Sequence, residues 1–171
     1  PAWSLPTWTK LLTGGIDVQE NCVYWVIRAW GEHWTSQLVA RGQAVNLWEV
    51  DGIMNLNYQK RDGTQMAPSL VLVDSGDQTD MVYDFCVDTA EYTLPSKGAS
   101  KKLETDYKIS TINKAGSRAT GHPLVMVDTS KYKDRIAARM ARKNGNGAWM
   151  VFRGIDDEYA AQVTAEHKIN E

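Results

Sequence analysis

The sequence predicts one mixed α/β domain in which helices cover both faces of a single β-sheet. Two observations support this fold class. Three consecutive stretches near the start of the chain have the β-branched and aromatic composition of strands, and short polar turns separate them. Beyond them, strand-like stretches alternate with stretches whose apolar residues have helical spacing. Antiparallel strands followed by strand–helix alternation are typical of a mixed sheet with helices packed on it.

The first half of the domain is predicted as three strands and a helix. The strands form an antiparallel meander, at residues 11–19, 22–30 and 34–45. A helix is predicted from Asn46 to Lys60, because apolar residues recur there at helical spacing. Asn46 and Glu49 have the spacing of a capping box, which places the start of this helix at Asn46.

The second half of the chain is predicted to alternate between strands and helices. The strands are expected at residues 69–74, 92–97, 107–112, 123–127 and 148–152. Three helices are expected in this half. The first begins after Asp77, which is its predicted N-cap, and the others lie at 129–143 and 156–167. In the helix at 129–143, Tyr132, Ile136 and Met140 share one face, which we expect to pack in the core.

Two carboxylates stand at demanding positions in the predicted strands. Asp17 lies in the first strand, where Ile16 and Val18 point to one face and Asp17 points to the other. Asp74 ends the strand that begins at residue 69. A carboxylate within an apolar strand is costly unless it is paired or binds a cation. The two residues therefore predict a site for divalent cations, of the kind that nucleases and other phosphoryl-transfer enzymes use.

The formal net charge of −2 hides a strongly basic segment. Residues 97–143 contain twelve Lys or Arg and four Asp or Glu, so the remainder of the chain is acidic. A basic segment beside an acidic metal site is what a nucleic-acid phosphodiesterase needs, although a solvated charged surface is the alternative interpretation. The predicted DNA contacts are the basic residues that follow residue 96 or share one face of the helix at 129–143: Lys97, Lys101, Lys102, Arg135, Arg139 and Arg142.

Two classes of protein are not expected from the sequence. No apolar run is long enough to cross a membrane. No Gly-x-x-x-x-Gly-Lys-Ser/Thr phosphate loop is present, so no ATP site is predicted in this chain.

The predicted element order is similar to that of a ribonuclease-H-like fold. In that fold the first strand is central and carries a catalytic Asp, and the fourth strand lies beside it and ends close to that Asp. Asp17 and Asp74 occupy these two places in the predicted order.

Four short segments also occur in an order and with spacings that match one known family. They are residues 13–19 (Thr-Gly-Gly-Ile-Asp-Val-Gln) with the following Trp-Gly-Glu at 30–32, residues 73–76 (Val-Asp-Ser-Gly) with the following Val-Tyr at 82–83, residues 97–100 (Lys-Gly-Ala-Ser), and residues 159–166 (Tyr-Ala-Ala-Gln-Val-Thr-Ala-Glu). Together they resemble the nuclease domain of lambda-type (GpA-like) terminase large subunits from tailed bacteriophages.

This resemblance implies an endonuclease that cuts concatemeric double-stranded viral DNA during genome packaging. It implies two Mg²⁺ or Mn²⁺ ions, held by Asp17 and Asp74, and two-metal phosphodiester hydrolysis. The implied partners are double-stranded DNA, the terminase ATPase domain, the small terminase subunit and the portal protein. No membrane is among the implied partners. The implied location is the cytoplasm of the bacterial host, at the procapsid portal.

The resemblance also defines what this chain is expected to lack. The family's third metal-binding acid lies on a helix beyond the last matching segment, so we expect it beyond Glu171, and Asp77 and Asp128 are the candidates within the chain. Residues 1–10 are expected to be a linker from a preceding ATPase domain. Residues 11–171 are expected to be the nuclease domain, truncated at its C-terminus.

Two other functions remain open at this point. A domain that binds DNA or the portal without cutting is the main alternative, because the third acid is missing from the motif. Actin-like sugar kinases also begin with Gly-Ile-Asp on a first strand, but they need a Gly-Thr phosphate turn where Val18 and Gln19 follow Asp17 here.

Overall fold

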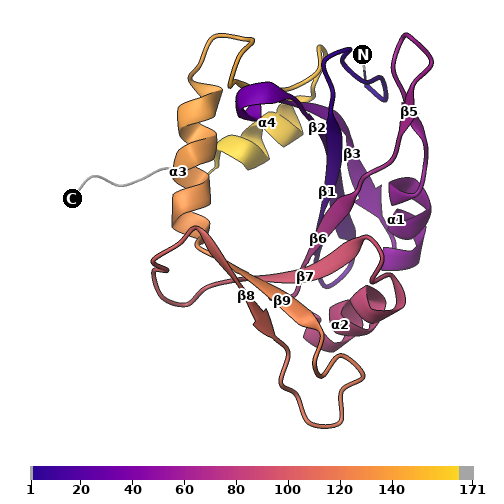
Figure 1. Ribbon diagram of the computed structural model, residues 1–171, viewed down its shortest axis with the longest axis vertical. Helices are drawn as coiled ribbons and strands as arrows, with labels where there is room; N and C mark the ends of the chain where they lie inside the picture. The colour runs from indigo at the N-terminus through magenta and orange to yellow at the C-terminus, as the bar shows by residue number, and fades with distance from the viewer. Residues whose placement is uncertain (1, 166–171) are drawn as a thin grey trace.

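The computed structural model describes residues 2–165, which form a mixed α/β fold around one large sheet (Figure 1). The eight strands of this sheet lie in the order β10-β3-β2-β1-β6-β7-β9-β8. Their bounds are β1 Leu11–Val18, β2 Val23–Trp30, β3 Ser36–Ala44, β6 Leu70–Asp74, β7 Thr93–Gly98, β8 Tyr107–Thr111, β9 Pro123–Val127 and β10 Trp149–Met150. A separate hairpin pairs β4 (Tyr58–Gln59) with β5 (Gln65–Met66).

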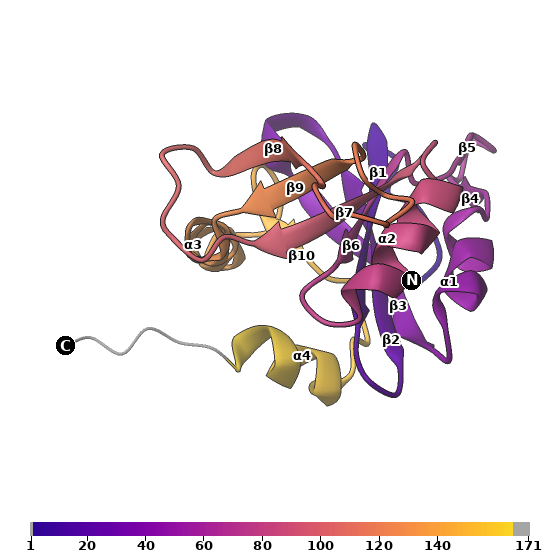
Figure 2. The ribbon, with the colours of Figure 1, turned by 90° about the horizontal axis from the view of Figure 1, so that it is seen from below.

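Four α-helices and one 3-10 turn complete the part of the chain that the structure describes. They are α1 Leu47–Met54, α2 Thr79–Asp88, α3 Thr129–Met140, α4 Asp157–Thr164 and the turn η1 Glu32–Trp34. Helices α1 and α2 lie on one side of the sheet, and α3 and α4 lie on the other (Figures 1 and 2). The predicted fold class, a mixed sheet with helices on both faces, is confirmed at this level. None of the described helices has the length and apolarity that a membrane span requires.

The predicted meander is confirmed by the strand pairing. Strand β1 pairs antiparallel with β2 along its whole length, and β2 pairs antiparallel with β3. Strand β6 then lies on the other side of β1 and runs parallel to it. The strand that carries Asp17 is therefore central, with the strand that ends in Asp74 as its neighbour.

The main core lies between the sheet and the helices α1 and α2. Ile16 and Val18 from β1 pack there with Val73 from β6, and all three side chains are buried. A glycine lets α1 approach the sheet closely. A Cβ added at Gly14 would lie 2.7 Å from the sulfur of Met54 and 2.8 Å from a methyl group of Val71. The absence of a side chain at this position therefore permits the observed packing.

Several predicted element boundaries were wrong, for tertiary reasons. The helix capped by Asn46 ends at Met54 instead of Lys60, because Tyr58 pairs with Met66 in the β4–β5 hairpin. The cap itself is confirmed, since the Asn46 side chain accepts a hydrogen bond from the backbone N–H of Glu49. The last helix is described only to Thr164, so the end predicted at residue 167 lies outside the described residues.

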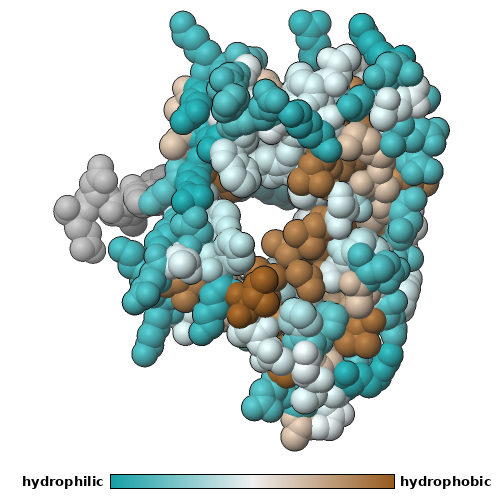
Figure 3. All heavy atoms as spheres, in the orientation of Figure 1, coloured by the Kyte–Doolittle hydropathy of each residue, from teal (hydrophilic) through white to brown (hydrophobic). Residues whose placement is uncertain are grey.

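The expectation that the apolar face of α3 packs in the core was wrong. No residue of α3 is buried, and the side chains of Ile136 and Met140 remain 37% and 36% exposed. The helix is joined to the rest of the domain through its polar groups, as described below. In Figure 3 an opening separates the atoms of α3 from those of the sheet. This face of the sheet is therefore accessible, unlike the face that α1 and α2 cover.

The segment predicted as a linker packs against the domain. The side chain of Leu5 is buried in the main core, and Trp3 stacks on Tyr58 with 6.0 Å between ring centroids. The backbone N–H of Trp3 donates to the carbonyl of Val39 in β3. Residues 3–5 therefore belong to the folded structure of the domain, whatever precedes them.

Replacing Gly14 by valine is expected to lower the free energy of unfolding by about 1–3 kcal/mol, because the new side chain overpacks the contact between α1 and the sheet. Gly52 in α1 provides the matched control, since a Cβ there meets nothing within 4 Å. Gly52→Ala should raise stability by roughly 0.4–1 kcal/mol. Urea denaturation of both variants measures the difference, and equal stability of Gly14→Val and the parent chain would contradict the packing described here.

Candidate metal and nucleic-acid site

Asp17 and Asp74 lie side by side on the accessible face of the sheet. The parallel pairing of β1 with β6 matches Ile16 with Val73, and each Asp follows one residue later. Neighbouring strands lie roughly 4.8 Å apart, and in-register residues of parallel strands point to the same face. Ile16 and Val73 are buried against α1 and α2, so the two carboxylates point to the opposite face, and both are exposed. The structure thus brings the two predicted site residues together.

The exposure of Asp17 corrects one step of the sequence argument. We expected the cost of burying a charge to require a partner or a metal. The side chain of Asp17 is exposed, so desolvation imposes no such requirement. The candidate site depends on the proximity of two carboxylates, and not on the burial of one.

The partners of the two carboxylates are neutral donors. The side-chain amide of Gln19 donates to both oxygens of Asp17, with 2.9 Å from Nε2 to each. The backbone N–H of Gly76 donates to Oδ1 of Asp74 over 2.9 Å. Among the described residues, no Lys or Arg forms an ion pair with either Asp. Neither carboxylate therefore has a cationic partner among the described side chains.

This donor set fits a hard divalent cation. Mg²⁺ and Mn²⁺ prefer carboxylate oxygens, and Mg²⁺ commonly binds through one or two carboxylates together with water and substrate phosphates. The described residues contain no group of three or more His, Cys, Asp or Glu able to hold a metal. Within residues 2–165 the site thus has two carboxylate ligands, Asp17 and Asp74.

Two polar residues near the carboxylates were not among the predicted site residues. Ser96 of β7 lies directly opposite Asp74 in the parallel pairing and shares its face of the sheet. Gln19 contacts Asp17 directly. Strand alternation already placed Gln19 on the face of Asp17, so this period-2 pattern was the signal that could have identified it. No comparable signal identified Ser96, because its position depends on the long-range pairing of β6 with β7.

The three predicted lysine contacts lie at or just beyond the C-terminal end of β7. Lys97 is on β7, where alternation directs it to the face opposite that of Ser96. Lys101 and Lys102 are exposed in the loop between β7 and β8. In the described structure none of these three ammonium groups forms an ion pair with a carboxylate. Their charges are therefore available to a ligand.

The predicted arginine contacts on α3 differ in their availability. Arg135 forms an ion pair with Asp106, with 2.6 Å from Nη2 to Oδ2. Arg139 donates to the backbone carbonyl of Gly147 over 2.9 Å and so links α3 to the segment that precedes β10. Arg142 follows α3 and is exposed. Two of the three guanidinium groups thus hold α3 in place.

The described residues contain no group of three ligating side chains that would bring Asp77 or Asp128 together with Asp17 and Asp74. The expectation that Asp77 caps α2 was wrong. The N-cap is Gln78, which has a φ of 47° and makes no side-chain hydrogen bond. Asp128 caps α3. One of its carboxylate oxygens accepts from the backbone N–H of Lys131 and the other from that of Leu103. Hydrogen bonding by the Lys131 N–H lowers the pKa of the Asp128 carboxyl group. Its oxygens therefore already have structural partners.

Helix α4 is fixed to the sheet by aromatic and cationic side chains. Tyr159 is buried, and the guanidinium of Arg41 lies 5.2 Å from the centre of its ring. Arg28 is also buried, 3.7 Å from the centre of the Trp149 ring, and it donates to the carbonyl of Met150. Burial lowers the pKa of Arg28 to about 10, so the guanidinium still carries its charge at neutral pH. These contacts attach α4 to the face of the sheet that carries Asp17 and help to hold β10 at the edge of the sheet, beside β3.

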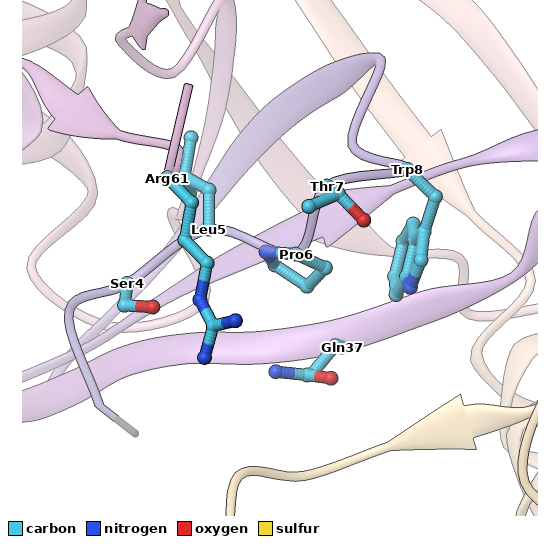
Figure 4. Close-up of a pocket in the computed structure, with 7 residues that line it drawn as sticks. All are labelled: Ser4, Leu5, Pro6, Thr7, Trp8, Gln37 and Arg61. Carbon is cyan, nitrogen blue, oxygen red and sulfur yellow. The ribbon is translucent and has the colours of Figure 1, made fainter. Parts of the chain in front are cut away.

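Two surface hollows are separate from the carboxylates. One hollow of about 340 Å³ lies between the N-terminal segment and the β4–β5 hairpin, and Figure 4 shows Arg61 and Trp8 on its opposite sides with Pro6 and Gln37 between them. A second, of about 450 Å³, includes Trp8 and residues near η1. Neither contains Asp17 or Asp74. The two carboxylates are therefore exposed outside both of these hollows.

Comparison with known proteins gives one match. A protein-family model described as "Terminase large subunit gpA, endonuclease domain" matches residues 1–171, the whole chain. No curated protein and no solved structure matches the chain.

Replacing Asp128 by alanine is expected to lower the melting temperature while leaving Mn²⁺ affinity unchanged, because the carboxylate caps α3 and is absent from the Asp17 site. The folded-state pKa of Asp128 is lowered, so its stabilising effect is present above the usual carboxyl pKa. That effect is lost as the pH falls through the lowered value. Thermal unfolding between pH 2 and 7 measures the loss of stability and its pH dependence. Loss of Mn²⁺ binding by Asp128→Ala in a calorimetric titration would instead make this residue a ligand.

Proposed function

Because the chain belongs to the family of gpA-type terminase large-subunit endonuclease domains, we propose that it cuts double-stranded DNA by metal-dependent, two-metal phosphodiester hydrolysis during viral genome packaging. The observation that carries this proposal is the pair formed by Asp17 and Asp74. Two exposed carboxylates lie on neighbouring parallel strands, point to one face and have no cationic partner among the described side chains. Such an arrangement attracts divalent cations.

A ribonuclease-H-like assignment for the fold is part of the same proposal. Its support is the strand order, in which an antiparallel meander, β3-β2-β1, is extended on the β1 side by the parallel strands β6 and β7. The first strand is central and carries one Asp, and the neighbouring β6 ends in the other. These are the places that the sequence order predicted for the two catalytic acids.

Each residue of the proposed site has a separate role. Asp17 and Asp74 hold the Mg²⁺ or Mn²⁺ ions through their carboxylate oxygens. When bound, the ions supply an activated water and stabilise the charge on the departing 3′ oxygen. The backbone N–H of Gly76 fixes one oxygen of Asp74 and leaves the other free to bind. The carboxylates are exposed on an accessible face, so a DNA backbone can reach them without a conformational change in the sheet.

Basic residues near this end of the sheet are proposed to hold the DNA backbone. Lys101 and Lys102 are the preferred contacts, because they are exposed and free of carboxylate partners within the described part of the chain. Lys97 adds a charge from the other face of β7, and Arg142 adds one beyond the end of α3. Arg135 and Arg139 would contact DNA only by exchanging their present partners.

The wider setting follows from the family and belongs to the proposal. The proposed partners are a terminase ATPase domain, the small terminase subunit and the portal protein, and the proposed location is the procapsid portal in the bacterial cytoplasm. Residues 1–10 are proposed to connect this domain to the ATPase domain. The third metal-binding acid of the family is proposed to lie beyond Glu171.

A DNA- or portal-binding domain without cleavage activity is the second candidate function. The observation in its favour is that the described residues offer two carboxylates at the site and no third acidic, His or Cys ligand. In this candidate function the basic surface binds DNA, but the domain does not cleave the phosphodiester bond. Metal-dependent nicking of plasmid DNA distinguishes the two functions.

Replacing Asp17 or Asp74 by asparagine is expected to lower Mn²⁺-dependent plasmid nicking by more than about 100-fold, since loss of even an outer partner of a metal commonly costs 10–100-fold. The exposed carboxylates contribute no core packing, so the circular dichroism spectrum should stay unchanged. Asp62→Asn, in the turn between β4 and β5, is the matched control. Undiminished nicking by Asp17→Asn would remove the assignment, and absence of metal-dependent nicking in the parent chain would favour the binding domain.

Replacing Lys101 and Lys102 together by alanine is expected to weaken DNA binding equally for all sequences and to reduce the slope of log K against log salt by roughly 1.8, since each phosphate contact contributes about 0.9. The control replaces Lys10 and Lys114, whose ammonium groups are paired with Glu32 and Asp80. Fluorescence anisotropy over a salt series measures both slopes. A larger change in the control pair would place the DNA on a different surface.

A further inference from the structure

Gln19 holds Asp17 in a way that concerns the metal site itself. Its Nε2 atom lies 2.9 Å from Oδ1 and 2.9 Å from Oδ2 of Asp17. A donor equidistant from both oxygens lies in the plane that bisects the carboxylate. A cation bound by both oxygens would lie in the same plane. The amide group is therefore next to the position where positive charge is expected to bind.

The backbone around Gln19 keeps this side chain close to Asp17. Gln19 follows β1 directly, and its backbone N–H donates to the carbonyl of Cys22 over 2.9 Å, which closes the turn into β2. Residues two apart on an extended strand share a face, so Gln19 remains beside Asp17 even when its side chain changes rotamer. Both side chains are exposed, which leaves room for such a change.

A glutamine can offer either of two groups to its surroundings. Its terminal amide carries two N–H donors on nitrogen and one acceptor oxygen. The NH₂ end suits a carboxylate without a cation, whereas the carbonyl oxygen is a hard ligand of the kind that binds Ca²⁺ and Mg²⁺. Rotation of the terminal amide by half a turn exchanges the two groups at the same position.

We propose that Gln19 is a third oxygen ligand of the metal site formed by Asp17 and Asp74. Without a cation, Nε2 of Gln19 donates to the Asp17 carboxylate. When a cation binds, the amide turns and presents Oε1 to it. Gln19 is neutral, so it adds an oxygen ligand without adding charge. This inference rests on the proposed metal site and assigns a ligand that carboxylate and histidine patterns do not reveal.

Mn²⁺ binding by isothermal titration calorimetry tests the proposal without requiring cleavage. Gln19→Met keeps the length of the side chain and removes the amide, and it should weaken Mn²⁺ binding by about tenfold. Gln19→Glu has no N–H donor but keeps an oxygen at the same distance, and it should bind Mn²⁺ at least as tightly as the parent chain. Unfolding midpoints of both variants should stay close to that of the parent chain, because Gln19 is exposed.

Gln43 provides the matched control for size and charge. It lies on β3, paired with Tyr24, which is itself paired with Asp17, so it is two strands away on the same sheet. Gln43→Met and Gln43→Glu should both leave Mn²⁺ affinity within about twofold of the parent value, since a charge some 10 Å away in solvent is largely screened.

The possible outcomes separate this proposal from the one on which it rests. Unchanged binding by Gln19→Met overturns the ligand role. Equal weakening by Gln19→Met and Gln19→Glu also overturns it, because the residue then acts only as a hydrogen-bond donor to Asp17. Tighter binding by Gln19→Glu matched by Gln43→Glu shows a general charge effect and overturns it as well. If Asp17→Asn itself binds Mn²⁺ like the parent chain, the metal site is wrong, and the role of Gln19 falls with it.

Discussion

The parallel pairing of β1 with β6 is the interaction on which the candidate site depends. Asp17 and Asp74 are far apart in the sequence, and each stands one residue beyond the matched pair of Ile16 and Val73. The pairing is fixed by the hydrophobic residues on the other face, since a shift of β6 by one residue would expose Val71 and Val73 and bury Asp74. The same core that stabilises the sheet thus determines that two acidic side chains meet.

The two faces of the sheet serve different purposes. The face under α1 and α2 is closely packed, to the point that Gly14 has no room for a side chain. The other face carries the carboxylates, and the helix that lies over it, α3, buries none of its residues. A helix held by Asp128 at its start and by Arg139 near its end leaves the surface beneath it open. Close packing and accessibility are therefore found on opposite sides of one sheet.

The basic segment contributes less free charge than its composition suggests. Arg135 is paired with Asp106, Lys114 with Asp80 and Arg118 with Asp88. Such exposed pairs add little to stability individually, but their cations are less available to a polyanion. Lys97, Lys101 and Lys102 have no carboxylate partner in the described structure, and they lie at or just beyond the C-terminal end of β7. Position within the fold, and not the count of basic residues, therefore defines the proposed DNA surface.

The sequence by itself determined the fold class, the opening meander, the cap at Asn46, and the positions of Asp17 and Asp74 in their strands, because alternation and capping act over a few residues. Only the tertiary structure decided the end of α1, the exposure of Ile136 and Met140 on α3, and the ion pairs of the basic segment. Each of these depends on what lies opposite in space: Met66 for Tyr58, an open face for α3, and Asp106 for Arg135. Local patterns encode which face of an element is apolar, but they do not encode whether another element will cover it.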